Sequence, residues 1–517
     1  MCKRVLMCFE CLRHTAQDKV PRHDFSGFAG FIRSPLSSFP VRKNDHLAFH
    51  PRLTDGFGKR AQQRQRKGSD MGQKHFGTDG IRGLVGKNQI TPEFCLRLSW
   101  AIGKVFTQEG RRPHILIGKD TRISGYMLES VLQSGFVSAG ADVSLLGPIP
   151  TPAIAYLTRT LNADAGVVIS ASHNPYYDNG IKLFDAKGNK LGDALEREIE
   201  AMIGQPMVCE DSASLGRASR INDAPGRYVE FCKNSVPWDF SLRGIKVVLD
   251  CAHGATYQSG PRVFNELGAE VVTMSVEPDG FNINERCGST HPEQLQQRVI
   301  EEAADLGIAF DGDGDRLVMV DEKGELLDGD HLLYVITRSR QARQTLQGGV
   351  VGTVMSNLGL ERSLPALSVP LVRAQVGDRH IMEALHQRQW TLGGEPSGHI
   401  LTLDLCSTGD AIIAGLQVLV AMQDAGLKLS EVASGLTKAP QLLINVDVDS
   451  PATVSEHSDL VKAIAAHEDA LGDRGRILVR PSGTEPLLRI MVEGEGDAEV
   501  ARVAEDLAAQ AKAIQLS

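Results

Sequence analysis

From Met71 onward, short apolar runs alternate with longer amphipathic segments, and a polar or glycine-containing loop closes each run. Such alternation predicts buried strands connected by crossover helices, which is the pattern of an α/β protein. Three of the runs begin the same strand–loop–helix unit: residues 115–118, 246–250 and 350–354. The pattern therefore predicts that one supersecondary unit is used three times along the chain.

Beyond residue 440 the pattern changes to three strands with only two helical segments among them. The expected strands are Leu442–Val448, Ile477–Val479 and Leu488–Val492. A smaller α+β domain is predicted there. With breaks expected near 225, 326 and 440, the folded part divides into domains at residues 71–225, 226–326, 327–440 and 441–517.

Residues 1–70 mix Pro, Ser, Arg and His without a period, and residues 60–67 form a basic, solvated run. We predict a disordered basic extension. Because the ordered pattern begins at Met71, our preferred explanation of residues 1–70 is a mis-assigned start, with upstream sequence read from too early a position. A transit peptide is the alternative, although the aspartates in the segment argue against it.

The formal net charge of the 517-residue chain is −9, and it is unevenly distributed. Residues 1–70 hold 14 Lys and Arg against 6 Asp and Glu, which leaves 41 basic and 58 acidic residues in the remainder. An acidic body argues against nucleic-acid binding and is typical of a protein that holds a metal among carboxylates. The nine cysteines form no dense framework: six are widely scattered, which is the usage of a reducing cytosol, and the clustered Cys2, Cys8 and Cys11 are expected to be unpaired thiols. No apolar run reaches membrane-spanning length. The longest run, residues 411–422, predicts a buried helix.

The eleven residues 170–180 (SASHNPYYDNG) follow an apolar run at 166–169 that predicts a buried parallel strand ending in a polar turn. Ligands of open α/β sheets collect at the carboxyl ends of such strands. A nucleophilic hydroxyl needs a nearby base and positive charge, and Ser172 has His173 beside it and Lys182 just beyond. The alternative is an ordinary serine turn or helix cap. Ser172 is therefore a candidate nucleophile.

The strongest local signal is the segment DGDGDR at 311–316. Asp311, Asp313 and Asp315 alternate with glycines that let the backbone curl, so their oxygens can meet at one point and bind Mg²⁺ or another hard cation. An EF-hand calcium loop is excluded because Arg316 stands where that loop requires glycine, and because a predicted strand follows. A solvated loop remains the alternative, although carboxylates this close repel one another unless a charge neutralises them.

Two further loops carry groups suited to a phosphorylated sugar. Residues 394–399 (GEPSGH) hold a carboxylate, a hydroxyl and an imidazole that can hydrogen-bond sugar hydroxyls, or they form a simple turn; residues 377–379 (GDR) are a weaker signal. Residues 480–485 (RPSGTE) offer backbone N–H groups, hydroxyls and a guanidinium as a phosphate cradle, or they form a hairpin loop with an exposed arginine. The chain has no Walker A loop and no GxSxG elbow, so nothing in it indicates a nucleotide.

Taken together, these segments resemble the α-D-phosphohexomutase superfamily over nearly all of residues 71–517. The motifs occur in the family's order: FGTDGIRG at 76–83, SASHNP at 170–175, DGDGDR at 311–316, GEPSGH at 394–399 and RPSGTEP at 480–486. The first motif and the form of the sugar loop look most like the bacterial phosphoglucosamine mutases. The resemblance implies three similar α/β/α domains and a smaller C-terminal α+β domain around one deep central cleft. The segment 1–70 departs from the family pattern.

The resemblance also implies roles for the matching residues. Ser172 would carry the transferred phosphoryl group as phosphoserine. The ligands of a Mg²⁺ ion would be Ser172, Asp311, Asp313 and Asp315. Lys182 and Arg82 would flank the phosphoryl group, with Lys182 or His173 near the general base. Glu395 and Ser397 would hold sugar hydroxyls, and Arg480, Ser482, Gly483 and Thr484 would hold the non-reacting phosphate, with Arg489 assisting. The further substrate-binding residues expected are Arg316, Asp378, Arg379 and His399.

The implied reaction is interconversion of glucosamine 6-phosphate and glucosamine 1-phosphate through a bound glucosamine 1,6-bisphosphate, which supplies UDP-GlcNAc and peptidoglycan precursors. We expect a cytoplasmic enzyme, monomer or homodimer, that acts on a small sugar phosphate without nucleic acid or membrane. An activating kinase or autophosphorylation would supply the first phosphate of Ser172. A phosphomannomutase or phosphoglucomutase would use the same parts, and no motif identifies the contact to the hexose 2-position. A metal-dependent phosphatase and a non-catalytic calcium or sugar-phosphate binding protein are further alternatives.

Overall fold

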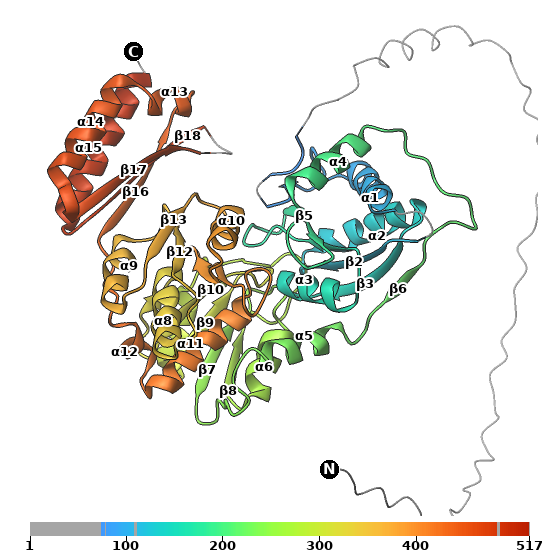
Figure 1. The fold of residues 1–517 in the computed structure, drawn as a ribbon, viewed down its shortest axis with the longest axis horizontal. Coiled ribbons are helices and arrows are strands. Elements are labelled where there is room, and N and C mark those ends of the chain that lie inside the picture. The colour runs from blue at the N-terminus through green and yellow to red at the C-terminus, as the bar shows by residue number, and fades with distance from the viewer. Residues whose placement is uncertain (1–73, 78, 108–110, 483–485, 516–517) are drawn as a thin grey trace, which may run out of the picture. The chain divides into compact units, whose positions relative to one another are not determined.

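The computed structural model describes residues 74–77, 79–107, 111–482 and 486–515, all within one compact unit, Ser69–Ser517. The extension predicted at residues 1–70 lies outside the described residues. Figure 1 shows that the described chain forms four sheets in succession, each with helices of its own.

The first sheet has six strands in the order β1-β5-β4-β2-β3-β6. Its strands are β1 (Ile81–Leu84), β2 (His114–Lys119), β3 (Asp142–Pro148), β4 (Ala165–Ile169), β5 (Asp178–Asp185) and β6 (Ala218–Arg220). Its helices are α1 (Pro92–Phe106), α2 (Ile123–Ser138), α3 (Thr151–Thr160) and α4 (Asp193–Ile203), and α5 (Ala224–Lys233) follows. Because side chains alternate along β2, Ile115 and Ile117 pack in the core with α1, α2 and α4, whereas Leu116 packs on the opposite face with α3 and α5. Helices therefore cover both faces of this sheet.

The second sheet has the order β11-β10-β9-β7-β8 and the third the order β13-β12-β14-β15. The second sheet and its helices comprise β7 (Lys246–Asp250), α6 (Ser259–Glu266), β8 (Glu270–Met274), α7 (Glu293–Glu301), β9 (Leu306–Phe310), β10 (Leu317–Asp321) and β11 (Leu326–Leu327). The third comprises α8 (Gly329–Ala342), β12 (Val350–Thr353), α9 (Leu358–Ser363), the 3₁₀ helix η1 (Leu364–Leu367), β13 (Leu371–Ala374), α10 (Asp378–Arg388), β14 (Leu392–Gly394), β15 (Ile400–Thr402), α11 (Ala411–Ala425) and α12 (Leu429–Ala433). Helix α11 confirms the buried helix predicted from its apolar run. No helix in the described part of the chain combines the length and the apolar character needed to cross a membrane.

One four-strand arrangement recurs in the first three sheets. A central strand pairs in parallel with two others, and one of these pairs antiparallel with a fourth: β2 with β3 and β4, then β5; β7 with β8 and β9, then β10; β12 with β13 and β14, then β15. The central strands β2, β7 and β12 are the three predicted runs, so the prediction of a repeated unit is confirmed.

Strand β4 differs in one respect from its prediction as a parallel strand. It is buried at every residue and runs parallel to β2 on one edge, but it runs antiparallel to β5 on the other. The short connection at residues 170–177 explains the difference, because a chain that turns back at once can pair only in the antiparallel sense.

The fourth sheet is antiparallel and has the order β16-β18-β17. Its elements are β16 (Gln441–Asp447), α13 (Pro451–Ser455), α14 (Ser458–Leu471), the 3₁₀ helix η2 (Gly472–Arg474), β17 (Gly475–Pro481), β18 (Leu487–Gly494) and α15 (Asp497–Gln515). Alternate residues of β18, Leu488, Ile490 and Val492, are buried in a core that includes α15. This sheet confirms the smaller α+β domain predicted beyond residue 440.

Candidate active site

The three predicted functional loops occupy one equivalent position in the three α/β sheets. Residues 170–177 connect β4 to β5, residues 311–316 connect β9 to β10, and residues 395–399 connect β14 to β15. Each loop is thus the turn of the antiparallel hairpin that ends the repeated four-strand arrangement. Each also begins at the carboxyl end of a strand that is parallel to its central neighbour, where α/β sheets commonly bind ligands.

Ser172 is brought into direct contact with the aspartate loop. Its hydroxyl donates a hydrogen bond to Asp311 Oδ2 at 2.6 Å, although the two residues are 139 positions apart. The side chain is fully buried, and the φ angle of +54° places Ser172 in the left-handed region. A non-glycine residue remains there only when its surroundings hold it, which is common at functional sites.

The guanidinium of Arg122, which precedes α2, holds the Ser172 loop by its backbone. Arg122 is fully buried. Its acceptors in the loop are the carbonyl oxygens of Ser172 (2.9 Å), Asn174 (2.7 Å), Pro175 and Asp178 (3.2 Å). Sequence reasoning did not select Arg122. The available signal was its position in the polar loop that follows the first predicted strand of the repeated unit.

Asp120 extends this support to the backbone N–H of Ser172. The Asp120 carboxylate accepts hydrogen bonds from Arg122 Nε at 2.8 Å and from the Ser170 hydroxyl at 2.7 Å. Ser170 Oγ in turn accepts from the N–H of Ser172 at 2.9 Å. On the other side, Asn284 Nδ2 donates to the Ser172 carbonyl at 2.9 Å. Both backbone polar groups of this strained residue are therefore fixed by buried side chains.

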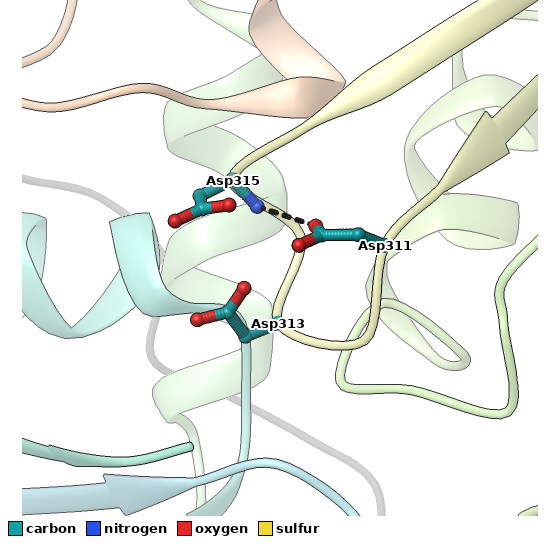
Figure 2. A group of neighbouring side chains, drawn as sticks. All are labelled: Asp311, Asp313 and Asp315. Atoms are coloured by element: carbon teal, nitrogen blue, oxygen red, sulfur yellow. Dashed lines mark hydrogen bonds between the residues drawn. The ribbon is translucent and has the colours of Figure 1, made fainter. Parts of the chain in front are cut away.

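The three aspartates meet as predicted (Figure 2). Each offers one carboxylate oxygen, and these oxygens all lie within 4.8 Å of one another in a buried setting. The N–H of Asp315 donates to Asp311 Oδ1 at 3.1 Å, which curls the loop. Asp313 Oδ1 and Asp315 Oδ1 are buried without a hydrogen-bond partner. With the Ser172 hydroxyl beside them, the donors are hard oxygens only, and they fit a hard divalent cation.

The carboxylates of this loop oppose one another's ionisation. Burial and the carboxylates of Asp315 and Asp313 raise the pKa of Asp311 well above its usual range. Burial opposes ionisation of Asp315 as well, but Lys182 and His399 hold its pKa well below the usual range. A bound cation would allow all three carboxylates to be ionised together.

Lys182 and Arg82 bring cations to the same point from β5 and β1. These strands pair antiparallel, with Arg82 opposite Gly180. Lys182 Nζ lies 2.9 Å from Asp313 Oδ2 and 3.2 Å from Asp315 Oδ2. Burial opposes the charge of Lys182, but the contacting carboxylates raise its pKa well above the usual range. Arg82 pairs with Asp79 and retains a buried Nε without a hydrogen-bond partner.

His173 lies between the Ser172 hydroxyl and a guanidinium. Its Nδ1 lies 3.4 Å from Ser172 Oγ and 3.0 Å from Arg316 Nη1. Burial, Arg316 and Arg82 lower the pKa of His173 to about 4, so the ring is neutral near pH 7. Lys182, by contrast, is held charged by its carboxylate partners and lacks a free electron pair at that pH.

A cavity of about 460 Å³ opens beside these groups. Its polar lining includes Arg82, Asp315, Arg316, Asp378, Glu395 and His399, which come from the first three sheets. Glu395 is oriented by the N–H of Gly377 and the hydroxyl of Ser397, both at 3.0 Å. Burial opposes protonation of His399, but Asp315 and Asp378 raise its pKa. The predicted sugar loop, residues 394–399, therefore shares one cavity with Arg82 and with the aspartate loop, residues 311–316.

Arg379 lies next to this cavity but is engaged elsewhere. Its guanidinium forms ion pairs with Asp193 and Glu196 of α4, and it is not among the residues that line the cavity. Its assignment to substrate binding stays a prediction.

The predicted phosphate loop lies between β17 and β18, as expected. Arg480 and Arg489 are directly opposite each other across the two strands, and Arg489 Nη2 lies 3.4 Å from Ser482 Oγ. Burial and the charge of Arg489 lower the pKa of Arg480. Guanidinium and hydroxyl groups are donors that commonly bind phosphate oxygens. Gly483 and Thr484 lie outside the described residues.

Comparison with known families agrees with this geometry. Models of all four domains of one family match in order: phosphoglucomutase/phosphomannomutase α/β/α domain I at residues 73–207, domain II at 226–324, domain III at 328–439 and the C-terminal domain at 443–510. The chain belongs to the phosphoglucomutase/phosphomannomutase family. The hairpin loops that carry Ser172, the three aspartates and Glu395 therefore fall in family domains I, II and III, respectively.

Relatives within the phosphoglucomutase/phosphomannomutase family are similar over nearly their whole length. Phosphoglucosamine mutase of Hahella chejuensis is 57% identical over 438 residues, which cover 85% of this chain and 98% of that protein. Phosphoglucosamine mutase of Alkalilimnicola ehrlichii is 58% identical over 438 residues, with 85% and 97% covered.

Solved structures show the same fold at low sequence identity. A phosphoglucomutase/phosphomannomutase family protein of Burkholderia thailandensis matches with a TM-score of 0.70 at 24% identity, covering 85% of this chain and 97% of its own. N-acetylphosphoglucosamine mutase of Aspergillus fumigatus, solved with GlcNAc-6P and magnesium, matches with a TM-score of 0.58 at 18% identity, covering 87% and 97%.

Proposed function

We propose that this chain is a phosphoglucosamine mutase that interconverts glucosamine 6-phosphate and glucosamine 1-phosphate through phosphoserine at Ser172 and a bound glucosamine 1,6-bisphosphate. The observation that carries the proposal is the buried Ser172 hydroxyl, 2.6 Å from a cluster of three aspartates, in a chain 57% identical to phosphoglucosamine mutases. A hydroxyl in that position can store a phosphoryl group only if the surrounding charge compensates the two negative charges that it adds.

The residues that would hold Mg²⁺ are Ser172, Asp311, Asp313 and Asp315. When bound, Mg²⁺ supplies positive charge to phosphoryl oxygens during an in-line transfer. The protein adds the cations Lys182, Arg82 and Arg316, which contact Asp313, Asp79 and His173, respectively, and we assign to them the charge that remains.

In the first half-reaction, a hydroxyl of the sugar attacks the phosphorus of phosphoserine 172. A P–O bond to the sugar forms and the P–Oγ bond breaks, which yields the 1,6-bisphosphate. We assign the hydroxyl proton to the neutral ring of His173, which returns it to Ser172 Oγ, 3.4 Å away. The resulting Ser172 hydroxyl then donates to Asp311, as in the structure. After the bisphosphate reorients, the same steps in reverse transfer its other phosphoryl group to Ser172.

The sugar and the idle phosphate need separate contacts for this scheme. We assign the sugar hydroxyls to Glu395, Ser397, His399 and Asp378 of the shared cavity region, together with Arg379. We assign the non-reacting phosphate to Arg480, Ser482, Gly483, Thr484 and Arg489. We place the enzyme in the cytoplasm, because widely scattered cysteines are the usage of a protein in a reducing compartment.

The test is turnover by Ser172→Ala beside Ser130→Ala, which removes an exposed hydroxyl of α2 as a matched control. We expect Ser172→Ala to lower kcat by about 10⁴-fold or more while Ser130→Ala leaves it unchanged. Comparable turnover of Ser172→Ala and the control would remove Ser172 from the mechanism.

The substrate is tested on the wild-type protein with glucosamine, mannose and glucose 6-phosphates. Preferred isomerisation of the glucosamine compound supports the proposal, whereas a preference for mannose or glucose would make the chain a phosphomannomutase or phosphoglucomutase. Release of inorganic phosphate in proportion to turnover would instead indicate a phosphatase.

A further inference from the structure

Lys190 joins two carboxylates that are far apart in the sequence. Its ammonium donates hydrogen bonds to Asp79, which precedes β1, and to Asp378, the first residue of α10. These partners are 111 and 188 residues away. Lys190 itself follows β5, and its backbone forms an isolated antiparallel β-bridge with Phe184 of that strand. One side chain therefore links the first and third sheets.

The link closes a ring of basic and acidic groups, four of which line the cavity. Asp79 forms an ion pair with Lys182 at 3.3 Å, and Lys182 forms a second ion pair with Asp315 at 3.2 Å. His399 completes the ring, because its two nitrogens lie 3.9 Å from Asp315 and 3.7 Å from Asp378. We call this set the charge ring; its members in order are Lys190, Asp79, Lys182, Asp315, His399 and Asp378.

The two carboxylates that bind Lys190 form part of the cavity wall. The side chains of Asp79 and Asp378 are mostly buried, and both line the cavity. Although burial opposes it, Lys182, Lys190 and Arg82 together hold the pKa of Asp79 well below its usual range. A carboxylate that loses its partner in such surroundings is destabilised and moves toward water or another cation. Without Lys190, Asp79 would keep Lys182 and Arg82 beside it and Asp378 would keep His399 at 3.7 Å, but the direct tie between the two wall carboxylates would be lost and their spacing could change.

Neighbouring contacts do not duplicate the link. Arg379 pairs with Asp193 and Glu196 of α4, and the hydroxyl of Ser407 donates to the Gly188 carbonyl at 2.7 Å. These contacts attach the third sheet to the first, but none of these residues lines the cavity. Lys190 differs from them because it contacts two residues of the wall, Asp79 and Asp378, and joins these two directly.

We infer that Lys190 is a positioning residue for phosphoryl transfer: by binding Asp79 and Asp378 together, it fixes the sugar-loop side of the cavity relative to the Ser172 loop. The inference rests on the proposed function, because it concerns the rate of that reaction. Lys190 does not line the cavity, so it acts through its two partners and not by touching the sugar.

The experiment compares steady-state kinetics of Lys190→Met, Lys190→Arg and Lys187→Met. Lys187 is exposed on the turn that leads to Lys190, so its replacement is a matched control. A displacement near 1 Å at a transfer site costs about 10²-fold in rate, so we expect that loss in kcat for Lys190→Met. We expect Lys190→Arg, which keeps a cation for both carboxylates, to recover most of it, and Lys187→Met to stay within about twofold of wild type.

A double-mutant cycle with Asp378→Asn tests whether the effect passes through the link. If Lys190 acts through Asp378, the loss in the double variant is smaller than the product of the single losses by about tenfold. Losses that simply multiply, or a Lys190→Met enzyme whose kcat equals that of Lys187→Met, would overturn the inference.

Thermal unfolding of the same variants separates positioning from folding. A purely structural role predicts a lower Tm with unchanged kcat per folded molecule, which would also overturn the inference. Failure of the proposed function is distinguishable, because the wild-type protein would then show no isomerisation in the same assay.

Discussion

Gly312 lies between Asp311 and Asp313 in the aspartate loop and allows this loop to approach Ser172 closely. A Cβ at position 312 would lie 2.6 Å from the Ser172 carbonyl oxygen, 2.8 Å from Asn284 Nδ2 and 2.9 Å from Ile283 Cδ1. Its φ angle is not in the left-handed region, so alanine fits the backbone and Gly312→Ala tests the approach alone. The substitution forces the two loops apart.

The magnitude follows from these distances. Ordinary contacts begin at 3.4 Å, so the loops must separate by roughly 0.8 Å to accept the methyl group. That movement would stretch the 2.6 Å hydrogen bond from Ser172 Oγ to Asp311 beyond hydrogen-bond length. Misplacement of about 1 Å costs roughly 10²-fold in rate, which is the expected loss in kcat. Overpacking of the contact should also destabilise the protein by about 1–3 kcal/mol.

The assay is conversion of glucosamine 6-phosphate to glucosamine 1-phosphate, with Gly226→Ala as the control. Gly226 lies in α5, and a methyl group there would meet no atom within 4 Å apart from its chain neighbours and the backbone of its own helix, so alanine should leave kcat unchanged. A Gly312→Ala enzyme that retains the kcat of Gly226→Ala would refute the argument that close approach of the two loops is required.

Three other predictions concern buried groups. Arg122→Met leaves Asp120 without its cation and should lower the free energy of unfolding by about 3–5 kcal/mol in a urea titration; a loss below about 1 kcal/mol would contradict the support assigned to Arg122. Burial raises the pKa of Asp410 to about 6, above its unfolded value of 3.8, so its stabilising contribution is complete below pH 3.8 and is lost as the pH rises through 6. The loss is about 3 kcal/mol, and unfolding of Asp410→Asn between pH 4 and pH 7 should lack it; an unchanged slope would contradict the assignment. Since the pKa of His173 is lowered to about 4, the part of the kcat/KM profile that depends on His173 should fall near pH 4, and a step near 6.5 that His173→Gln removes would contradict a neutral ring.

Sequence patterns predicted the parts of the site whose residues lie close together in the chain. The alternation of Asp and Gly at 311–315 contains its own geometry, because three carboxylates two residues apart on a curled backbone must converge. The central strands β2, β7 and β12 were likewise visible as apolar runs. Ser172 could be singled out because a base and a cation follow it closely in the chain.

The groups that sequence reasoning missed act across long separations. Arg122 binds carbonyl oxygens about fifty residues away, and Lys190 joins carboxylates on two sheets. Nothing in the local pattern distinguishes such a buried cation from a solvated one, because the partner is chosen by the tertiary fold. The same limit applies to β4, whose residues show burial on both faces but not the direction of each neighbour.

The equivalence of the three functional loops also required the structure. Each follows a different strand in the sequence, and the residues of the loops share no common pattern. The pairing of β4 with β5, β9 with β10 and β14 with β15 shows that the serine, the aspartates and the sugar loop lie on three equivalent hairpin turns, one in each sheet.

The central claim is that Ser172 stores the transferred phosphoryl group, and mass spectrometry of the purified protein tests it most directly. The account predicts one phosphoryl group on the peptide that contains Ser172, absent from Ser172→Ala, with turnover proportional to the phosphorylated fraction. Full turnover by protein whose Ser172 stays unmodified throughout the reaction would contradict it.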